Sequence, residues 1–508
     1  MNNMQTPKPL TSSSLTAGLK LDQLRFDNRY TRLPAEFFSR HLPEPLLNQR
    51  LAHFNRRVSG LLEIDPDEGQ RPDLFDQFTG VREWPGSEPF AQCYAGHQFG
   101  QFVHRLGDGR ALTVAQIRNS KDELWDLQLK GSGHTLYSRQ GDGKAVLRST
   151  IREYLCSEAM AGLGIPTTQA LAMSASDEPV FRERPETGAM LVRVAPSHIR
   201  FGMFEYFFYR HQYEDLKTLG DYVIDNYFSA LADTDNPSLS LLENIIGSTA
   251  KLIAGWQSVG FCHGVMNSDN MSIHGITIDY GPFGFLDTYN SGHICNHSDH
   301  SGRYAFDRQP AIGLFNLSCL AQAMLPLISE DADTAVKLAT DALGKYEGIF
   351  ESEYLDLKRR KLGLIGKEAG DDSLYDELLN VMQHSHLDFT NTFRNLARPL
   401  DMTLAHIVPD SDSQRLKNWL MRYRERLKQE DFDEEKRVNL IKSSSPAYVL
   451  RNYLAEKVIQ DAREQNDFTE LETMMELLSD PFNEKSEYAA YAEDAPQWSK
   501  TLSVSCSS

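Results

Sequence analysis

The chain has 508 residues, of which 41% are hydrophobic and 24% are charged, and its formal net charge is −19. This length allows two to four domains or lobes, and the acidic balance argues against a protein that binds nucleic acid through a basic surface. No apolar run approaches the roughly 18 residues that a membrane helix requires, so we expect no membrane partner.

Residues 1–95 are irregular and punctuated by proline, which predicts an N-terminal extension more than a domain. The first 20 residues lack the apolar centre of a secretory signal. Six widely spaced cysteines without a CxxC pair indicate a reducing compartment. We therefore expect a cytoplasmic protein. A mitochondrial location is the alternative in a eukaryote. The absence of acidic residues before Asp22 is typical of a transit peptide, but the absence of arginine before Arg25 is not.

Residues 96–212 show strand patterns around one helix. Residues 111–117 and 124–130 are rich in residues that favour strands. Residues 145–164 have the apolar spacing of a helix that ends in a Gly- and Pro-containing stretch, and residues 189–195 predict a further strand. This segment is therefore expected to be a small β-rich lobe.

The same segment contains a local excess of positive charge. Residues 105–152 hold nine Lys and Arg against five Asp and Glu, inside an acidic chain. The simpler interpretation is a solvated basic face, which is the commoner case. The alternative is a pocket for a small polyanion such as a nucleoside triphosphate.

Particular residues in this segment suit phosphate binding. Gly107, Gly109 and Arg110 lie in a turn before a strand, where missing side chains let the backbone approach phosphate oxygens, although hairpins often contain such a sequence. Lys130 ends a strand, and Glu153 follows 23 residues later on the predicted helix. A strand Lys and a helix Glu can pair and direct the ammonium group at phosphates, but they can also be unrelated surface residues.

Arg193 is the one charged residue within the strand predicted over 189–195. A buried guanidinium group requires an anionic partner. That partner could be a carboxylate of the protein or a bound phosphate, and Arg200 seven residues later favours the phosphate.

From residue 213 onwards the pattern becomes helical. An apolar stripe over residues 242–256 ends before Gly260, and helical periodicity resumes near residue 311 and continues to about 480. We therefore predict an α+β, protein kinase-like bilobal fold. The small β-rich lobe covers residues 96–212 and the large helical lobe covers residues 213–410. Residues 411–508 form a C-terminal helical extension with a mobile Cys-containing tail.

The stretch HGVMNSDNMSIHGITIDYG, residues 263–281, has the parts of a phosphate-transfer site, with one exception. A kinase-type loop places a proton-accepting Asp two residues after its His, and this position is Val265. Asn270 and Asp279 offer the hard oxygen ligands that Mg²⁺ or Mn²⁺ prefers, with Asp279 expected at a strand end. Asp269 is then the nearest carboxylate that could accept a proton.

The sequence HICNHSDH also suggests zinc through His293, Cys295, His297 and His300. Spacings of one residue are poor for a tetrahedral site, and no second Cys pair supports it. We therefore expect no zinc site here.

Several long motifs give the chain a family resemblance. They are YAGHQFGQF (94–102), LGDGRA (106–111), WDLQLKGSGHTLYSRQGDGKAVLRSTIREYL (125–155), HGVMNSDNMSIHGITIDYGPFGFLD (263–287) and the terminal SCSS (505–508). Together they resemble the selenoprotein O family of kinase-like proteins over essentially the whole chain.

The resemblance implies a protein adenylyltransferase that binds ATP in a flipped orientation and uses Mg²⁺ or Mn²⁺. It implies that AMP is transferred to hydroxyl side chains of protein substrates. By the motifs, Glu153 pairs with Lys130 and Asp269 acts as the base, while Asn270 and Asp279 hold the metal. The nucleotide-binding residues that it implies are Gly107, Gly109, Arg110, Lys130, Asp142, Gly143, Arg193, Arg200 and Asp279.

The resemblance also implies a redox link. Some members of the family carry selenocysteine where this chain has Cys506, and Cys295 matches the position of its partner near the active site. A thiol–disulfide switch would then involve a thiol-reducing protein such as a glutaredoxin or thioredoxin.

Three alternatives to adenylyl transfer remain open at this point. The site could act as an atypical protein or small-molecule kinase, with Asp269 as its proton acceptor. It could also transfer UMP from UTP, since no residue of the sequence indicates which nucleobase is bound. The chain could also be a nucleotide-binding pseudokinase scaffold, although intact metal ligands argue against that role.

Overall fold

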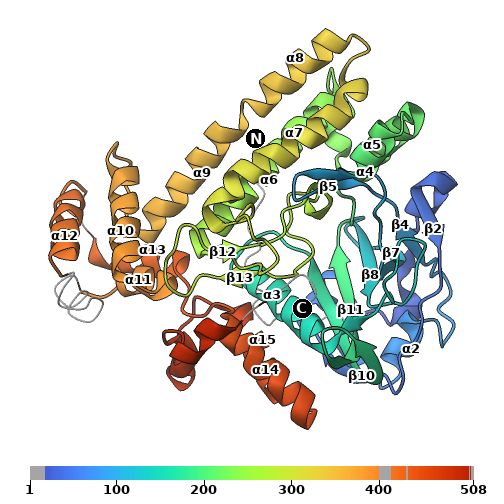
Figure 1. The fold of residues 1–508 in the computed structure, drawn as a ribbon, viewed down its shortest axis with the longest axis horizontal. Coiled ribbons are helices and arrows are strands. Elements are labelled where there is room, and N and C mark those ends of the chain that lie inside the picture. The colour runs from blue at the N-terminus through green and yellow to red at the C-terminus, as the bar shows by residue number, and fades with distance from the viewer. Residues whose placement is uncertain (1–17, 400–412, 431–432, 503, 505–508) are drawn as a thin grey trace.

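A computed structural model describes residues 18–399, 413–430, 433–502 and 504. Within these residues the fold is a mixed α/β structure, in which helices cover a large antiparallel sheet (Figure 1). The described strands of this sheet are β1 (Arg25–Phe26), β2 (Phe38–Arg40), β3 (Arg50–Phe54), β4 (Phe90–Gln92), β7 (Ala111–Arg118), β8 (Leu124–Lys130), β9 (Ala145–Val146), β10 (Gln169–Phe181) and β11 (Pro185–Ala195). Their order is β2-β4-β7-β8-β11-β10-β3, with β1 on β7 and β9 on β11.

The three strands predicted within residues 96–212 are confirmed. β7 and β8 pair directly, and β11 pairs with β8 so that Arg193 lies opposite Gln128. Leu127 and Leu129 are fully buried on one face of β8. A further long strand, β10, was not predicted, and it lies between β11 and the edge strand β3.

The prediction of an irregular N-terminal segment was wrong for four stretches. β1, β2, β3 and β4 all come from this segment and all belong to the large sheet. Each has only two to five residues, which is too short for a reliable alternating pattern. Pairing within the sheet stabilises these strands, and Phe90 on β4 is fully buried.

A strand before Asp279 was also expected, and this prediction was wrong. Thr277 forms an isolated bridge with Thr167, and the neighbouring residues are not in a strand. Asp279 has a φ of 59°, in the left-handed region, which ends extended backbone. The structure also contains two small two-stranded sheets. One is the hairpin of β5 (Gly96–Gln98) and β6 (Gln101–Val103), and the other pairs β12 (Phe261–Cys262) with β13 (Gly284–Phe285), on either side of Asp279 in the chain.

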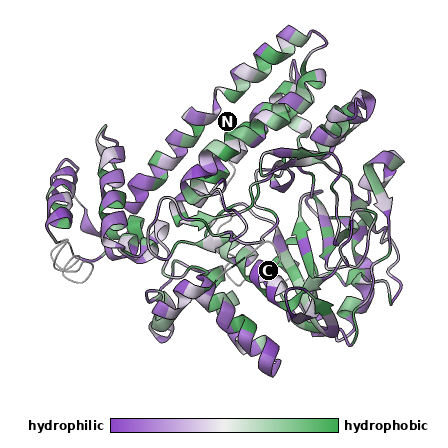
Figure 2. Cartoon of the chain, viewed as in Figure 1, coloured by the Kyte–Doolittle hydropathy of each residue, from purple (hydrophilic) through white to green (hydrophobic). Residues whose placement is uncertain are grey.

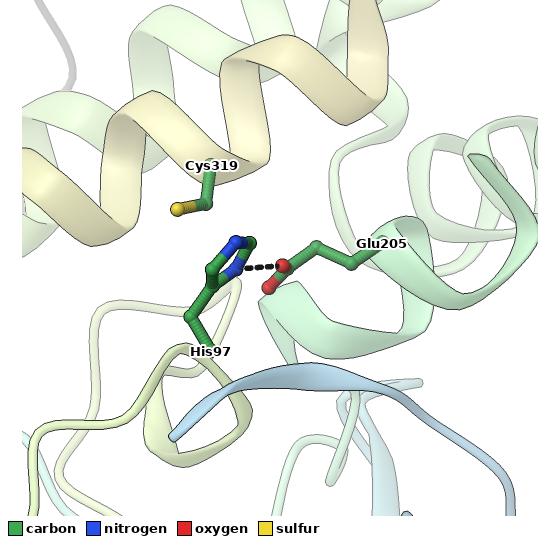
Figure 3. Close-up of side chains that lie close together, drawn as sticks. All are labelled: His97, Glu205 and Cys319. Atoms are coloured by element: carbon green, nitrogen blue, oxygen red, sulfur yellow. Dashed lines mark hydrogen bonds and ion pairs between the residues drawn. The ribbon is translucent and has the colours of Figure 1, made fainter. Parts of the chain in front are cut away.

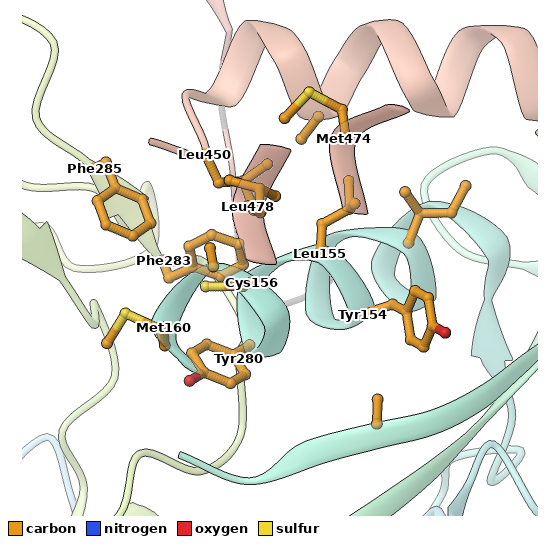
Figure 4. Packing of buried hydrophobic residues seen from close by; sticks show 14 of the residues in the cluster. Tyr154, Leu155, Cys156, Met160, Tyr280, Phe283, Phe285, Leu450, Met474 and Leu478 are labelled. Atoms are coloured by element: carbon orange, nitrogen blue, oxygen red, sulfur yellow. The ribbon is translucent and has the colours of Figure 1, made fainter. Parts of the chain in front are cut away.

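The predicted helix over 145–164 is α3 (Leu147–Gly162), which packs against β10 and β11. Its opposite side is covered by α14 (Asn452–Gln465) and α15 (Thr469–Ser479). Figure 4 shows this core, in which Leu155 and Cys156 of α3 pack in one cluster with the loop residue Phe283 and with Leu478 of α15. The C-terminal helices thus form part of the main hydrophobic core.

Residues 96–212 contain one helix more than predicted. α4 (Phe201–Tyr209) precedes α5 (Tyr213–Tyr227). The sequence FGMFEYFFY is aromatic at most positions and so has no polar face to reveal a helical period. α4 is nonetheless helical because it packs against α5 and α7 (Gln309–Ile328).

The predicted apolar stripe over 242–256 lies on α6 (Pro237–Val259), and this helix is confirmed. It ends at Gly260, whose φ of 70° is left-handed, as expected of a helix cap. α6 packs with α7, α8 (Ala332–Leu343) and α9 (Tyr346–Lys361) as a group of long helices beside the sheet (Figure 1). Their exposed turns are hydrophilic, while apolar residues concentrate on α6 and α7 (Figure 2).

Helical structure continues toward the C-terminus, as predicted. The remaining described helices are α1 (Arg56–Leu61), α2 (Leu74–Phe78), α10 (Asp371–Ser385), α11 (Phe389–Asn395), α12 (Ser413–Leu427) and α13 (Glu434–Ser444). Beyond α15, a 3₁₀ turn over Gln497–Thr501 places the ring of Trp498 6.1 Å from that of Tyr453.

One described helix, Phe306–Ile328, is long and apolar enough to cross a membrane by length and composition alone. No such segment was predicted from the sequence. Its contacts are those of a core helix, because the buried side chains of Gln309 and Asn316 donate hydrogen bonds to the carbonyl groups of Phe261 and Met266.

Candidate active site

A cavity of about 760 Å³ opens between the sheet and the stretch 263–281. It brings together residues from both halves of the chain. The predicted nucleotide, metal and base residues that line it are Gly107, Gly109, Arg110, Lys130, Asp142, Gly143, Arg193, Arg200, Asp269, Asn270 and Asp279.

A chain of buried ion pairs forms one wall of this cavity. Lys130 on β8 contacts Glu153 on α3, so the predicted pair is present. Arg193 on β11 donates from Nε to the other Glu153 oxygen at 2.6 Å and from Nη2 to Asp279 at 2.8 Å. The anionic partners of Arg193 in this structure are therefore carboxylates of the protein.

Arg200 continues this wall toward the loop. Its Nη1 contacts the second oxygen of Asp279 and donates to the Asp269 carbonyl group at 2.8 Å. The same nitrogen is 3.5 Å from Oδ1 of Asn270, and the guanidinium lies 4.8 Å from the ring centre of Tyr94. The oxygens of Asn270 and Asp279 thus converge on one cationic atom.

The pKa values of Asp279 and Lys130 in this wall are both lowered, for different physical reasons. Burial alone would raise the pKa of Asp279, but Arg200, Arg193 and Lys130 hold this pKa well below its usual range. Burial lowers the pKa of Lys130 to about 8, against the opposing effect of Glu153. Asp279 is therefore ionised at neutral pH, in a left-handed conformation of the kind that often marks a functional site.

Asp269 has a different environment, although it is close by. Its side chain is buried, Oδ2 accepts a hydrogen bond from the Gln98 amide at 3.1 Å, and Oδ1 has no described partner. Burial raises the pKa of Asp269 to about 7, despite the hydrogen bond from Gln98 and the charge of Arg200. A carboxyl group with this pKa can accept a proton near neutral pH.

Two glycines let the backbone close around the cavity. Gly107 has a φ of 144°, and a Cβ atom there would lie 2.3 Å from the ring of Tyr137. Gly143 has a φ of 70°, and a Cβ atom there would lie 1.9 Å from the carbonyl oxygen of Gly133. A side chain at either position would displace backbone or an aromatic ring that lines or supports the cavity.

Asp142 lies at the outer edge of the cavity and pairs with Arg182 at 2.7 Å. The hydrogen bond from Arg182 lowers the pKa of Asp142. Arg182 and Gln98 both line the cavity, and sequence reasoning assigned neither of them a role. The motif YAGHQFGQF contains Gln98 and could have drawn attention to it.

The start of the loop is held by buried contacts. A ring nitrogen of His263 lies 3.0 Å from the Ile278 carbonyl group, and burial lowers the pKa of this histidine. Asn270 donates from its amide to the carbonyl group of Val265 at 3.0 Å. His263 therefore positions the loop, while Val265 presents an apolar side chain where a kinase-type loop has a carboxylate.

Cys295 lies behind this loop. Its thiol donates to the carbonyl group of Cys262 at 3.4 Å, and burial raises its pKa well above the usual range. The predicted partner, Cys506, lies outside the described residues. The backbone N–H of His297 donates to the carbonyl group of Val504 at 2.9 Å, so the described end of the chain returns to this loop.

Comparison with known proteins agrees with these observations. The family model described as "Protein adenylyltransferase SelO" matches residues 20–479. A Thioalkalivibrio sulfidiphilus protein named "Protein nucleotidyltransferase YdiU" is 50% identical over 494 residues, which cover 96% of this chain and 100% of that protein. Proteins of the same name from Myxococcus xanthus and Vibrio vulnificus are 48% and 45% identical, and each match covers 96% of this chain and 99% of the relative.

Proposed function

The chain belongs to the SelO family of protein adenylyltransferases, and from this membership we propose that it transfers AMP from ATP to hydroxyl side chains of proteins. The products would be an adenylylated Ser, Thr or Tyr and pyrophosphate. The relatives are named protein nucleotidyltransferases, a name that fits this reaction and leaves the nucleotide open.

We assign the architecture to a kinase-like bilobal fold, with the cavity between its lobes. The large sheet and α3 would form the small lobe, within residues 96–212 and with added strands from the first 95 residues. Helices α5 to α9 would form the large lobe within 213–410, and residues 411–508 the C-terminal extension. The Lys130–Glu153 pair between the sheet and α3 supports this assignment.

The observation that carries the proposal is the charged inner wall of the cavity. Lys130, Arg193 and Arg200 are all buried, with exposed fractions of 5%, 4% and 2%. Glu153 and Asp279 form the ion pairs of these three cations, so two paired carboxylates face three positive charges. An uncharged purine ring gains little in such surroundings, whereas a triphosphate group supplies the missing negative charge. ATP would therefore bind with its terminal phosphates at this wall.

The cavity also suits a divalent metal ion. Asn270 and Asp279 are hard oxygen donors, and both approach the same Arg200 nitrogen, which takes the position of a cation between them. These two side chains would hold Mg²⁺ or Mn²⁺. When bound, the ion would neutralise phosphate charge.

The residues of the cavity would carry out the transfer of AMP in the following way. Lys130, Arg193 and Arg200 orient the β- and γ-phosphates, so that the α-phosphorus faces the opening and the acceptor protein. The ionised carboxyl of Asp269 takes the proton of the acceptor hydroxyl while the hydroxyl oxygen forms a bond to the α-phosphorus. The bond from the α-phosphorus to the bridging oxygen breaks, and pyrophosphate leaves among the cationic groups.

This proposal is tested with ATP labelled at either the α- or the γ-phosphate, incubated with bulk cellular protein and Mg²⁺ or Mn²⁺. We expect label to enter protein from the α-position only, and none with Asp279→Ala. Label from the γ-position alone would identify a kinase instead, and no label with tight ATP binding would identify a scaffold. A parallel reaction with α-labelled UTP determines whether UMP is the transferred group.

A further inference from the structure

A second group of chemically reactive side chains lies outside the cavity. His97 on β5, Glu205 on α4 and Cys319 on α7 point toward one another from three separate elements (Figure 3). One potential ligand atom from each lies within 4.8 Å of the others. None of the three lines the cavity of the candidate active site.

Glu205 is the least expected member of this group, because its side chain is fully buried. Its Oε2 is 2.5 Å from Nδ1 of His97, while its Oε1 is a buried atom without a described hydrogen-bond partner. Both oxygens are directed toward the His97 ring (Figure 3). A buried carboxylate with an unused oxygen requires further positive charge or a further donor.

The surroundings favour a bound ion over free water. The rings of Phe102 and Phe315 lie 5.1 and 5.8 Å from the His97 ring, and the Tyr209 ring lies 6.2 Å away. These aromatic side chains form an apolar shell around a nitrogen, an oxygen and a sulfur donor. Such a shell limits solvent access to a metal centre.

We propose that His97, Glu205 and Cys319 bind a transition-metal ion of the Zn²⁺ type. Imidazole nitrogen, carboxylate oxygen and thiolate sulfur are the ligands that Zn²⁺ takes in proteins, whereas Mg²⁺ prefers oxygen alone. Binding would release the Cys319 thiol proton to solvent and form the metal–sulfur bond. Three protein ligands leave a fourth position for water.

The contacts of His97 indicate what such an ion would do. The ion would connect the β5–β6 hairpin to α4 and α7. The backbone N–H of His97 donates to the Ser268 hydroxyl at 2.7 Å, and the next residue, Gln98, donates to Asp269. The metal would thereby fix the hairpin that contacts the candidate base, as a structural centre distinct from the Mg²⁺ or Mn²⁺ site.

Full-length protein, freed of metal with a chelator, is titrated with Co²⁺ and then with Zn²⁺. We expect one Co²⁺ per chain with the near-ultraviolet charge-transfer band of a cobalt–thiolate bond, and loss of this band when Zn²⁺ displaces Co²⁺. Cys319→Ser should abolish the band, and Glu205→Gln should weaken Zn²⁺ binding at least tenfold. Absence of the band in the unmodified protein would overturn the proposal.

Two controls separate this centre from other binding. Cys93→Ser removes another buried thiol, which donates to the Glu36 carbonyl group at 3.1 Å, and should leave the band unchanged. Asp279→Asn alters the candidate Mg²⁺ or Mn²⁺ site and should also retain the band. A band that persists in Cys319→Ser contradicts the assignment. If Cys319→Ser does not fold, the isosteric Glu205→Gln decides by its Zn²⁺ affinity.

Discussion

At the scale of single residues, Asp269 has a carboxyl group that titrates near neutral pH. Because its pKa is about 7, we expect kcat/KM of adenylyl transfer to rise with pH up to about 7. It should fall again above about pH 8, where Lys130 loses its proton. Asp269→Asn removes the proposed base and should lower kcat by about 10²- to 10⁴-fold. The pH–rate profile of both proteins checks this, and a variant with unchanged kcat would refute the role of Asp269.

The same titration has a consequence for stability. The raised pKa of Asp269 means that the folded protein binds a proton more tightly than the unfolded chain does. The stability from this group is fully present below about pH 4 and is lost as pH rises through about 7, by about 4 kcal/mol at most. Asp269→Asn should therefore raise the free energy of unfolding at pH 8 but change it little at pH 4. Urea denaturation at both pH values tests this, and a variant less stable than the parent at pH 8 would contradict it.

Glu153 is a second residue whose role can be measured. It balances both Lys130 and Arg193 in a buried position, so Glu153→Gln leaves two buried cations with too little negative charge. We expect a loss of about 3–5 kcal/mol in the free energy of unfolding, together with lost transferase activity. The matched control is Glu178→Gln at the more exposed Lys144–Glu178 pair, where about 1 kcal/mol or less is expected. Equal losses in the two variants would show that burial of the pair is not decisive.

At the scale of elements, the β5–β6 hairpin packs closely against the candidate base. A Cβ atom on Gly96 would lie 2.8 Å from both Cβ and Oδ1 of Asp269. Gly96→Ala should therefore displace Asp269 and lower kcat by about 100-fold, since a shift of about 1 Å at a reacting group has this effect. Its cost in unfolding free energy should be only about 1–3 kcal/mol.

The matched control for this hairpin is Gly247→Ala on α6, where an added Cβ atom meets nothing within 4 Å. This change should leave kcat unaltered and stabilise the protein by about 0.5–1 kcal/mol, because alanine favours the helix. Kinetics and thermal melts of both variants separate the two effects. Full activity in Gly96→Ala would show that Asp269 tolerates displacement or is not the base.

Elements with a long apolar stripe or a run of strand-favouring residues could be predicted from the sequence. α3 and α6 show the apolar spacing of a helix, and β7 and β8 are seven or eight residues long and rich in residues that favour strands. β10 has 13 residues but no such pattern, and it was missed. β2 and β4 have three residues each, so their position depends on partners elsewhere in the chain. The strand expected before Asp279 failed for a related reason, because ion pairs hold that residue in a left-handed conformation.

In the candidate site, too, some contacts could be predicted from the local sequence and others could not. The Lys130–Glu153 pair could be predicted because strand and helix are consecutive. The sequence left open whether the partner of Arg193 was a carboxylate or a phosphate, and the structure places Glu153 and Asp279 there. Gln98 was missed because it is uncharged and lies 171 residues from Asp269 in the chain. Such contacts depend on the tertiary fold and leave little trace in local sequence.

At the scale of the whole molecule, the C-terminal region closes back on the catalytic half. α14 and α15 pack on α3, the helix that carries Glu153. Farther along, Val504 accepts a hydrogen bond from the backbone of His297, two residues after Cys295. This contact brings the described end of the chain to the segment that holds one predicted redox cysteine.

We therefore predict that Cys295 and Cys506 form a disulfide when the protein is treated with oxidised glutathione, which is reduced as the bond forms. Burial raises the pKa of Cys295 well above its usual range, so few thiolates exist at pH 7 and oxidation should be slow there and faster at pH 9. Peptide mass spectrometry after timed quenching measures the bond, and glutaredoxin or thioredoxin should reverse it. Cys262→Ser is the control for pairing with the wrong thiol, because the Cys262 side chain also lies next to Cys295. The Cys295–Cys506 bond should still form in this variant. Free thiols at both Cys295 and Cys506 after prolonged oxidation at pH 9 would exclude the switch.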